Sequence, residues 1–318
     1  MTAYPSGEVL VEIERSGVVE GVHRGHLVVL DPNGAVRLAI GEVRAPMFPR
    51  SSLKPVQAVA MLRSGLFLAP EEVALASSSH DGEPMHIAGV QAMLATGGLD
   101  ESDLECPPDL PTGEGARQAV LAAGDGPRRI YMNCSGKHAA MLRTCVVNDW
   151  PLSGYLPPTH PLQQRIAETI AAVADEPVAA IGVDGCGAPV FAISLTALAR
   201  SFSRLATGNG ADAAVAAAMR AYPALVGGTT QVSSRVMAGV PGVIVKNGAE
   251  GVFAAALMDG GALALKVDDG ASRAADRVLV GALRRLGVDA QILDDLAEEP
   301  VLGGGARVGS VRLRPGVL

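Results

Sequence analysis

The 318-residue sequence is 48% hydrophobic but only 3% aromatic, so Ala, Val and Leu must supply most of the core. Its formal net charge of -7 argues against binding to nucleic acid or to an anionic membrane surface, because such binding usually needs a basic face. The acidic N-terminus and the absence of a long apolar run predict neither a signal peptide nor a membrane span, so we expect a cytoplasmic protein.

The first 48 residues predict strands joined by tight turns. Apolar and polar residues alternate there, and Asp31-Pro32-Asn33-Gly34 is a typical hairpin turn. From residue 52 to about 180, apolar residues recur at helical spacing instead. The helices expected in this block span 55–64, 84–97, 114–123, 137–147 and 161–174.

Strand patterns return near the C-terminus, at 242–248, 251–257, 262–270 and 306–314, with helices expected at 192–205, 210–221 and 271–286. The simplest architecture is an α/β (α+β) fold in which both chain ends build one largely antiparallel sheet covered by helices. We expect residues 1–318 to form a single catalytic unit. Residues 1–50 plus 190–318 would form a sheet-containing lobe and residues 51–189 a mainly helical lobe, with a site in the cleft between them.

Ser51-Ser52-Leu53-Lys54 begins one of these helices. Pro55 lacks an N–H donor, which is harmless only in the first turn, so the helix must start near Ser51 or Ser52. Pro55 also disfavours the α conformation at Lys54, which predicts an irregular start. A serine there would lie at the positive end of the helix dipole, and Lys54 could take its proton if burial keeps the amine neutral.

Two interpretations of this string remain open. Serine is a preferred N-cap, and most Ser-x-x-Lys strings are only a cap followed by a surface lysine. Ser51 has the three-residue spacing to Lys54, whereas Ser52 would be the more ordinary cap. The sequence alone does not decide which serine would react.

Two other segments place polar groups beside buried runs. Ser77 to His80 follow an apolar stretch, and this loop is either functional or a polar cap before the next helix. Lys266 lies in an expected strand among apolar neighbours, so its amine should be partly buried and should need a partner.

Four cysteines in a chain of this kind predict thiols or metal ligands rather than disulfides. Cys134 and Cys186 lie in glycine-containing loops and could share a zinc ion if the fold brings them together. Neither belongs to a Cys-x-x-Cys pair, so buried free thiols are the alternative. Cys106 and Cys145 are interpreted as structural.

Taken together, these segments resemble one family, the rhizobial-type L-asparaginases. The shared strings, in the order seen in that family, are HRGH, PRSSLKPVQA, SSHDGEPMH, NCSGKHAAML, HPLQQRI, DGCGAPVFA, KNGAEGV and KVDDGASR. The resemblance extends from about residue 8 to 286. It departs at Ser233 and Ser234, where the family more often has an aspartate, which bears on a pocket wall and hence on substrate specificity.

The resemblance implies a fold similar to serine β-lactamases and glutaminases, a homodimer, and hydrolysis of L-asparagine through two Ser–Lys pairs. Carried over residue by residue, these pairs are Ser51 with Lys54 and Ser79 with Lys266. The resemblance also implies a metal site, usually occupied by zinc, whose ligands map to Cys134, Lys137 and Cys186 with Asp184 close by. As a ligand, Lys137 must be a neutral amine, which zinc could enforce by displacing the proton.

We therefore expect an asparaginase in which a serine attacks the amide carbon and a neutral lysine accepts its proton and passes it to ammonia. We favour Ser51 as the nucleophile, with Ser79 and Lys266 relaying protons, and leave the opposite assignment open. Zinc would hold the loops near the substrate or orient its α-amino acid end, because a lysine and two thiolates leave it little Lewis acidity. The residues expected to bind the substrate are Arg50, His80, Asn133, His138, Asp184 and Asp269.

Three alternatives to this function are kept. The same fold could serve a glutaminase, or a serine acyl transferase that recognises β-lactams. A non-catalytic amino-acid-binding protein is the third, although binding alone would not need paired hydroxyls and amines such as Ser51 and Lys54.

Overall fold

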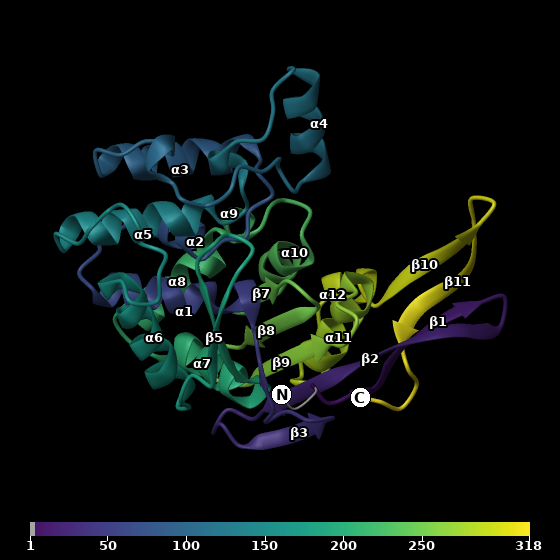
Figure 1. Ribbon diagram of the computed structural model, residues 1–318. Helices are drawn as coiled ribbons and strands as arrows, with labels where there is room; N and C mark the ends of the chain where they lie inside the picture. The colour runs from purple at the N-terminus through teal and green to yellow at the C-terminus, as the bar shows by residue number, and fades with distance from the viewer. Residues whose placement is uncertain (1–3) are drawn as a thin grey trace.

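A computed structural model describes residues 4–318, and its centre is an eight-stranded antiparallel sheet built from both ends of the chain (Figure 1). The strands are β1 (Glu8–Arg15), β2 (Val18–Leu30), β3 (Val36–Ile40), β7 (Ile244–Gly248), β8 (Val252–Ala256), β9 (Ala262–Val267), β10 (Glu298–Gly303) and β11 (Ala306–Leu313). Their order is β10-β11-β1-β2-β9-β8-β7, and β3 pairs with β2 beside this path. The expected α/β architecture, with a sheet drawn from both termini, is confirmed.

The turn between β2 and β3 forms at the predicted Asp31-Pro32-Asn33-Gly34 segment. The Asp31 carboxylate accepts hydrogen bonds from the backbone N–H groups of Asn33 and Ala35, at 2.8 and 3.0 Å. Gly34 has φ 81°, a conformation that glycine adopts without a steric penalty.

Helices cover both faces of the sheet at its middle. The side chains of β9 alternate between the two faces, yet all but Lys266 are buried, which requires cover on each side. The covering helices are α7 (Leu195–Thr207) and α11 (Ser272–Arg285), which both pack on β9. Because β7 is the last strand on its side, its free edge is available to the helical part of the chain.

Most of the remaining helices lie at the left and top of Figure 1, whereas α10 (Val232–Gly239) and α12 (Gln291–Asp295) lie near its centre, and they pack mainly on one another. The others are α1 (Lys54–Arg63), α2 (Pro70–Ala76), α3 (Pro84–Thr96), α4 (Glu114–Ala122), α5 (Ser135–Val147), α6 (Pro161–Ala174), α8 (Ala211–Ala221) and α9 (Pro223–Val226). In residues 4–318, no helix is long and apolar enough to cross a membrane.

A small second sheet was not expected from the sequence. It has the order β4-β6-β5 and consists of β4 (Pro46–Met47), β5 (Ala180–Val183) and β6 (Pro189–Ser194). The helix expected from residue 192 therefore begins only at Leu195, because the preceding six residues form the buried strand β6. The expected lobe boundary after residue 189 also falls inside this strand.

The helical part meets the free edge of the sheet at a short 3-10 turn, η1 (Arg50–Leu53), which leads into α1. The predicted irregular helix start is this turn. Gly248 at the end of β7 makes the close approach possible, because a Cβ there would lie 2.3 Å from the carbonyl oxygen of Pro49. The edge of β7 and the start of α1 thus form the two sides of one junction.

Candidate active site

The two serines at the start of α1 have different surroundings. The Ser52 side chain is fully buried, and its hydroxyl donates to the carbonyl of Pro49 at 2.7 Å. Ser51 is only half-buried. It follows Arg50, whose φ of 53° is unusual for a residue other than glycine. Ser52 is thus held in a structural contact, and Ser51 is the more exposed of the two serines.

Ser79 lies between two buried amines. Its Oγ is 3.0 Å from Lys54 Nζ and also 3.0 Å from Lys246 Nζ. Lys54 comes from the first turn of α1, Ser79 from the loop after α2, and Lys246 from β7. Lys54 is 1% exposed and Lys246 is 0% exposed, so water screens this arrangement poorly.

Lys246 makes two hydrogen bonds besides its contact with Ser79. Lys246 Nζ donates to the backbone carbonyl of Asn247 at 2.9 Å and to its Oδ1 at 2.8 Å. A neutral amine has only two protons and one lone pair, so Nζ can then accept the hydroxyl proton of Ser79. Burial, and then the positive charge of Lys54, hold the pKa of Lys246 well below its usual range.

Lys54 has the complementary role. Its Nζ donates to the backbone carbonyl of Ser78 at 2.6 Å and lies at hydrogen-bonding distance from Ser79 Oγ. Hydrogen-bonding distances thus join the amine of Lys54, the hydroxyl of Ser79 and the amine of Lys246 in one chain of contacts. The chain of three groups can therefore carry a proton from one amine to the other.

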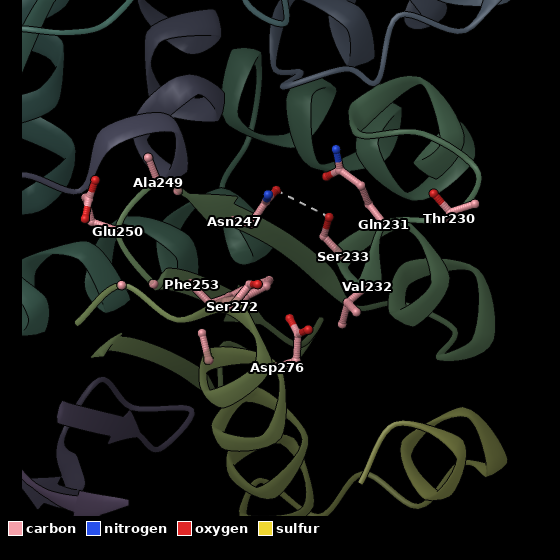
Figure 2. Close-up of a pocket in the computed structure, with 14 residues that line it drawn as sticks. Thr230, Gln231, Val232, Ser233, Asn247, Ala249, Glu250, Phe253, Ser272 and Asp276 are labelled. Carbon is pink, nitrogen blue, oxygen red and sulfur yellow. Dashed lines mark hydrogen bonds between the residues drawn. The ribbon is translucent and has the colours of Figure 1, made fainter. Parts of the chain in front are cut away.

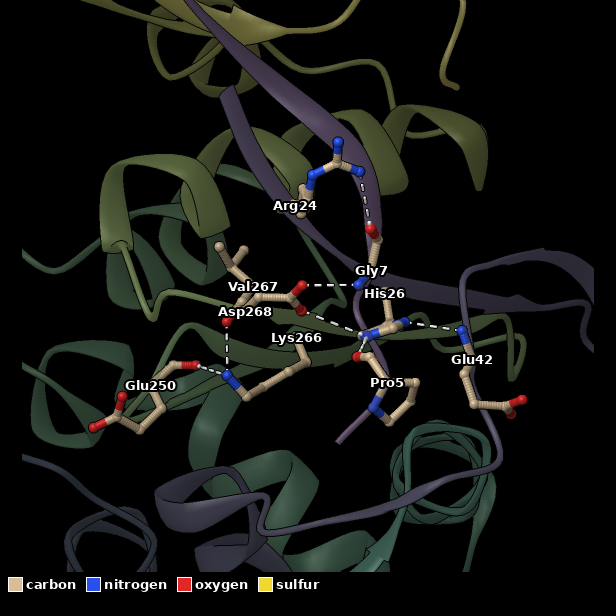
Figure 3. A network of polar contacts seen from close by, with 9 residues as sticks. All are labelled: Pro5, Gly7, Arg24, His26, Glu42, Glu250, Lys266, Val267 and Asp268. Atoms are coloured by element: carbon tan, nitrogen blue, oxygen red, sulfur yellow. Dashed lines mark hydrogen bonds and ion pairs between the residues drawn. The ribbon is translucent and has the colours of Figure 1, made fainter. Parts of the chain in front are cut away.

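The expected pairing of Ser79 with Lys266 is not what the structure shows, and Lys246 takes that place. Lys266 Nζ donates instead to the backbone carbonyls of Glu250 and Val267, at 2.7 and 2.6 Å (Figure 3). Its amine is partly buried and does have partners, as the sequence predicted, but these partners belong to the β7–β8 turn and to its own strand.

Arg50 and Asp184 form an ion pair beside Ser51. Arg50 Nη2 and Nε lie 2.7 and 2.8 Å from Asp184 Oδ1. The same oxygen accepts the backbone N–H of Gly185 at 2.8 Å. The pair joins the start of α1 to the loop that carries Cys186, so the structure brings together two residues that were expected to bind the substrate.

His80 and Asn133 belong to neighbouring loops that contact each other. The backbone N–H of His80 donates to the carbonyl of Asn133 at 3.1 Å. His80 Nε2 is 2.8 Å from Ser135 Oγ, which donates its own proton to Ile130, so Nε2 carries the proton of the ring. Burial, and then His86 and Lys54, lower the pKa of His80, and the imidazole is neutral.

The thiols of Cys134 and Cys186 lie beside Lys137. Lys137 Nζ donates to Cys186 Sγ at 3.2 Å, and Cys134 Sγ is 3.0 Å from Asn133 Oδ1. Hydrogen bonding with Cys134 and then Lys137 hold the pKa of Cys186 far below its usual range, against the opposing effect of burial. Burial lowers the pKa of Lys137, but the two sulfurs outweigh it and the net shift is upward.

These groups fit a soft metal ion only if the lysine is counted as a ligand. In the described part of the chain, no cluster of three or more His, Cys, Asp and Glu side chains could hold a metal. The donors available are two sulfurs and the Lys137 amine, a set that suits zinc. His138 Nδ1 is 2.7 Å from the Tyr155 hydroxyl, and burial lowers the pKa of His138 against the smaller, raising effect of its interaction with Cys186.

Asp269 is not brought to the two buried amines. Its Oδ2 is 2.6 Å from His23 Nδ1, and its Oδ1 accepts the backbone N–H of Ala271. It lies in the turn after β9 and contacts His23 on β2. Nothing in these contacts connects it to Ser51 or Ser79.

Lys246 and Asn247 are the residues that the sequence analysis missed. Lys246 follows the apolar run Val243–Val245 and precedes Asn247-Gly248, so its buried position has the same local signal as that of Lys266. The added signal is Gly248, since a glycine directly after a strand often permits a close backbone approach. That approach places β7, rather than β9, beside Ser79.

An open cavity of about 380 Å³ adjoins the Asn247 end of this arrangement (Figure 2). The start of α10, the β7–β8 turn and the start of α11 form its walls. Asn247 connects the cavity to the buried amines, because its Oδ1 accepts from Lys246 Nζ at 2.8 Å and lies 3.4 Å from Ser233 Oγ.

Comparison with known families finds one match that covers nearly the whole chain. The family described as L-asparaginase II matches residues 11–313. No curated protein matches the sequence significantly.

Several solved structures are similar at low sequence identity. A crystal structure of Mglu in its native form has a TM-score of 0.44 and 15% identity, covering 82% of this chain and 63% of that chain. This chain therefore spans less than two thirds of the length of that Mglu chain. A putative β-lactamase from Bacteroides dorei has a TM-score of 0.46 and 14% identity, covering 82% of this chain and 92% of that chain. A β-lactamase from Mycobacterium bovis has a TM-score of 0.37 and 15% identity, covering 83% and 95%.

Proposed function

Since the chain belongs to the L-asparaginase II family, we propose that it hydrolyses L-asparagine to L-aspartate and ammonia by serine acyl transfer. The observation that carries the proposal is the Ser79 hydroxyl, which lies 3.0 Å from each of two buried amines. Such an arrangement can move protons directly between side chains, and amide hydrolysis through an acyl-enzyme requires proton transfer to and from the nucleophilic serine. A binding protein would gain nothing from burying two amines around one hydroxyl.

Ser51 is the proposed nucleophile. It is more exposed than Ser79, which is 7% exposed, and it stands at the start of a helix, where the dipole favours a developing negative charge. The turn that carries Ser51, η1, leads into Lys54 and contacts β7, the strand of Lys246-Asn247-Gly248. This is analogous to the three-part arrangement of penicillin-recognising enzymes, whose Ser-x-x-Lys serine is the nucleophile. The analogy concerns the placement of the groups and not their sequence.

The first proposed step prepares the base. Lys54 donates a proton to Ser79 Oγ while the Ser79 hydroxyl proton passes to Lys246, which leaves Lys54 neutral and Lys246 charged. Two buried ammonium groups this close would repel each other strongly, so the pair holds a single positive charge that shifts across Ser79.

Bond making and breaking then follow at Ser51. Its Oγ attacks the side-chain amide carbon while neutral Lys54 takes the hydroxyl proton. Lys54 returns that proton to the departing nitrogen, so the C–N bond breaks and ammonia leaves an ester on Ser51. Water cleaves the ester with Lys54 again accepting a proton and then restoring it to Ser51.

A zinc ion is proposed at Cys134, Lys137 and Cys186. When bound, it would hold the two loops that carry these residues and so orient the α-amino acid end of the substrate. Lys137 Nζ donates to Cys186 Sγ, so zinc binding through this amine would have to release a Lys137 proton. The Arg50–Asp184 pair ties the same loop to Ser51, and we propose that it fixes the spacing between the loop and the nucleophile.

The test measures ammonia release from asparagine and from glutamine, and ring opening of a β-lactam, at equal substrate concentrations. We expect asparagine to be the best substrate. Preference for glutamine would indicate a glutaminase, opening of the β-lactam would indicate an acyl transferase of that class, and no turnover of any substrate would refute the proposal. Ser51→Ala and Ser79→Ala variants should both be impaired, and full activity in both would end the serine mechanism.

A further inference from the structure

Asp81 carries a buried carboxylate to which the catalytic proposal gives no task. It follows Ser79 and His80 in the loop after α2 and is only 6% exposed. Within residues 4–318, none of the ion pairs involves this carboxylate. A carboxylate this buried normally has a cation beside it, because burial of an uncompensated charge costs free energy. The Asp81 charge is therefore not neutralised locally and can act on a cation farther away.

A single side-chain amide, that of Gln231 at the start of α10, connects Asp81 to Ser79. Gln231 Nε2 donates to Asp81 Oδ1 at 2.6 Å and to the backbone carbonyl of Ser79 at 3.1 Å. The Thr112 hydroxyl makes a longer contact with the same Asp81 oxygen, at 3.4 Å. Because an amide nitrogen has two hydrogens, both are used here, and Gln231 fixes the spacing between the carboxylate and the Ser79 backbone.

The backbone packs tightly around Asp81. Its N–H donates to the carbonyl of Gly227 at 2.6 Å, and its carbonyl accepts the N–H of Gly113 at 2.9 Å. A Cβ added at Gly113 would lie 2.8 Å from Asp81 Cβ, and one added at Gly228 would clash with Asp81 Oδ2. The side chain is therefore enclosed on two sides, and its charge has a fixed place relative to Ser79.

The cation on which this charge can act is Lys246. Lys246 is 0% exposed, and charges in so poorly screened an interior interact beyond direct contact. Burial, and then Lys54, lower the pKa of Lys246, whereas Cys134 and Asp81 raise it. Burial also lowers the pKa of His86 on α3, and Asp81 is among the groups that raise it. Asp81 thus favours the state in which Lys246 holds a proton.

We propose that Asp81 is a positioning residue of the proton relay: its charge stabilises the proton on Lys246 while Lys54 is neutral, and Gln231 holds Asp81 and Ser79 together. The inference rests on the proposed function. The step that it assists moves one proton from Ser79 Oγ to Lys246 Nζ while Lys54 Nζ gives one to Ser79 Oγ, so the net charge is unchanged. Without the Asp81 charge, Lys246 accepts the proton less readily, and less neutral Lys54 is available as the base.

The decisive variant is Asp81→Asn, which keeps an oxygen acceptor for Gln231 but removes the negative charge. With L-asparagine, the acid limb of kcat/KM should move to lower pH by about half a unit to one unit, because the pKa of Lys246 loses an upward influence. For the same reason kcat should fall about 3- to 10-fold, while KM changes little. Asp276→Asn is the matched control and should leave the acid limb in place, because Asp276 is also only 16% exposed but is not among the groups that shift the pKa of Lys246. All samples are compared at equal zinc content.

Gln231→Leu keeps the test valid if Asp81→Asn folds poorly. Leucine has a similar size but donates no hydrogen bond to Asp81 or Ser79, so kcat should fall about 10-fold or more with little change in KM. Gln163→Leu is its matched control. Gln163 is also buried and donates to a backbone carbonyl, that of Tyr155 at 2.9 Å, but it does not contact the relay. This control should lower the thermal unfolding midpoint and leave kcat near that of the wild type.

The outcomes separate the two levels of the proposal. Wild-type protein that releases no ammonia from asparagine refutes the proposed function and the role of Asp81 with it. Active wild type whose kcat and acid limb are unchanged in Asp81→Asn refutes the role of Asp81 alone. A lower kcat with an unmoved acid limb would make Asp81 a structural residue and would also overturn the inference. If Asp81→Asn does not fold, equal kcat in Gln231→Leu and Gln163→Leu would overturn it.

Discussion

Replacing Lys246 by methionine should disable the enzyme, whereas the same change at Lys266 should not. Methionine has a similar length and volume but can neither accept the Ser79 proton nor donate to Asn247. Without Lys246 to accept the Ser79 proton, Lys54 does not become the neutral base, and the loss of general base catalysis costs about 10²- to 10⁴-fold in rate, or roughly 3–5 kcal/mol in the barrier. The substitution also removes the hydrogen-bond donor of the Asn247 backbone carbonyl and of Asn247 Oδ1. Each oxygen left without a donor should lower the free energy of unfolding by about 1–3 kcal/mol.

The assay is ammonia release under kcat/KM conditions, with the thermal unfolding midpoint measured on the same samples. Lys266→Met is the matched control, because Lys266 also lies on a central strand and donates to two carbonyls, but does not contact Ser79. We expect Lys246→Met to fold and to be nearly inactive, and Lys266→Met to retain activity within about tenfold of the wild type. Inactivation by Lys266→Met with normal activity in Lys246→Met would refute the assignment.

Three further predictions concern pH, packing and metal. Lys246 must be neutral to accept a proton, and burial lowers its pKa. We therefore expect kcat/KM to fall as the pH drops through the pKa of Lys246 and to be constant above it. A pH-independent kcat/KM would contradict this prediction. Gly248→Ala should reduce activity or folding yield, because the added Cβ would clash with the backbone carbonyl of Pro49. Gly115→Ala is the control and should match the wild type in activity and folding yield, because no atom lies within 4 Å of a Cβ at that position. Cys186→Ser should lower the zinc bound per chain, measured by elemental analysis, whereas Cys145→Ser should not; equal zinc contents would exclude the site.

The sequence predicts the helices of the middle block well, because their apolar spacing is a local property. The helix over 161–174 is observed as Pro161–Ala174, and the turn at Asp31 to Gly34 forms as expected. The sheet assembled from both termini also follows from local strand patterns plus the rule that strands need partners. The helix expected from 192 begins late because 189–194 form a buried strand, whose continuous apolar run has no clear period.

The choice between two lysines could not be made from the sequence. Lys246 and Lys266 both follow apolar strand residues, and each precedes a polar turn. What separates them is strand order: β7 is the edge strand that contacts η1, while β9 lies inside the sheet between β2 and β8. Strand order depends on contacts between distant parts of the chain, so no local pattern contains it.

The role of Ser51 was only partly accessible for a related reason. Its spacing to Lys54 is visible in the sequence, but the contact that Lys54 makes is with Ser79, 25 positions away. That contact depends on the packing of α1 against the loop after α2. The sequence therefore identifies the groups, and the fold determines which hydroxyl touches which amine.

The most direct test of serine acyl transfer at this site is mass spectrometry of protein that is acid-quenched during turnover of L-asparagine. We predict one aspartyl group attached as an ester to the peptide that contains Ser51, absent in Ser51→Ala and accumulating to a different level in Ser79→Ala. Turnover without any acylated serine, or acylation confined to Ser79, would contradict the assignment of Ser51 as the nucleophile.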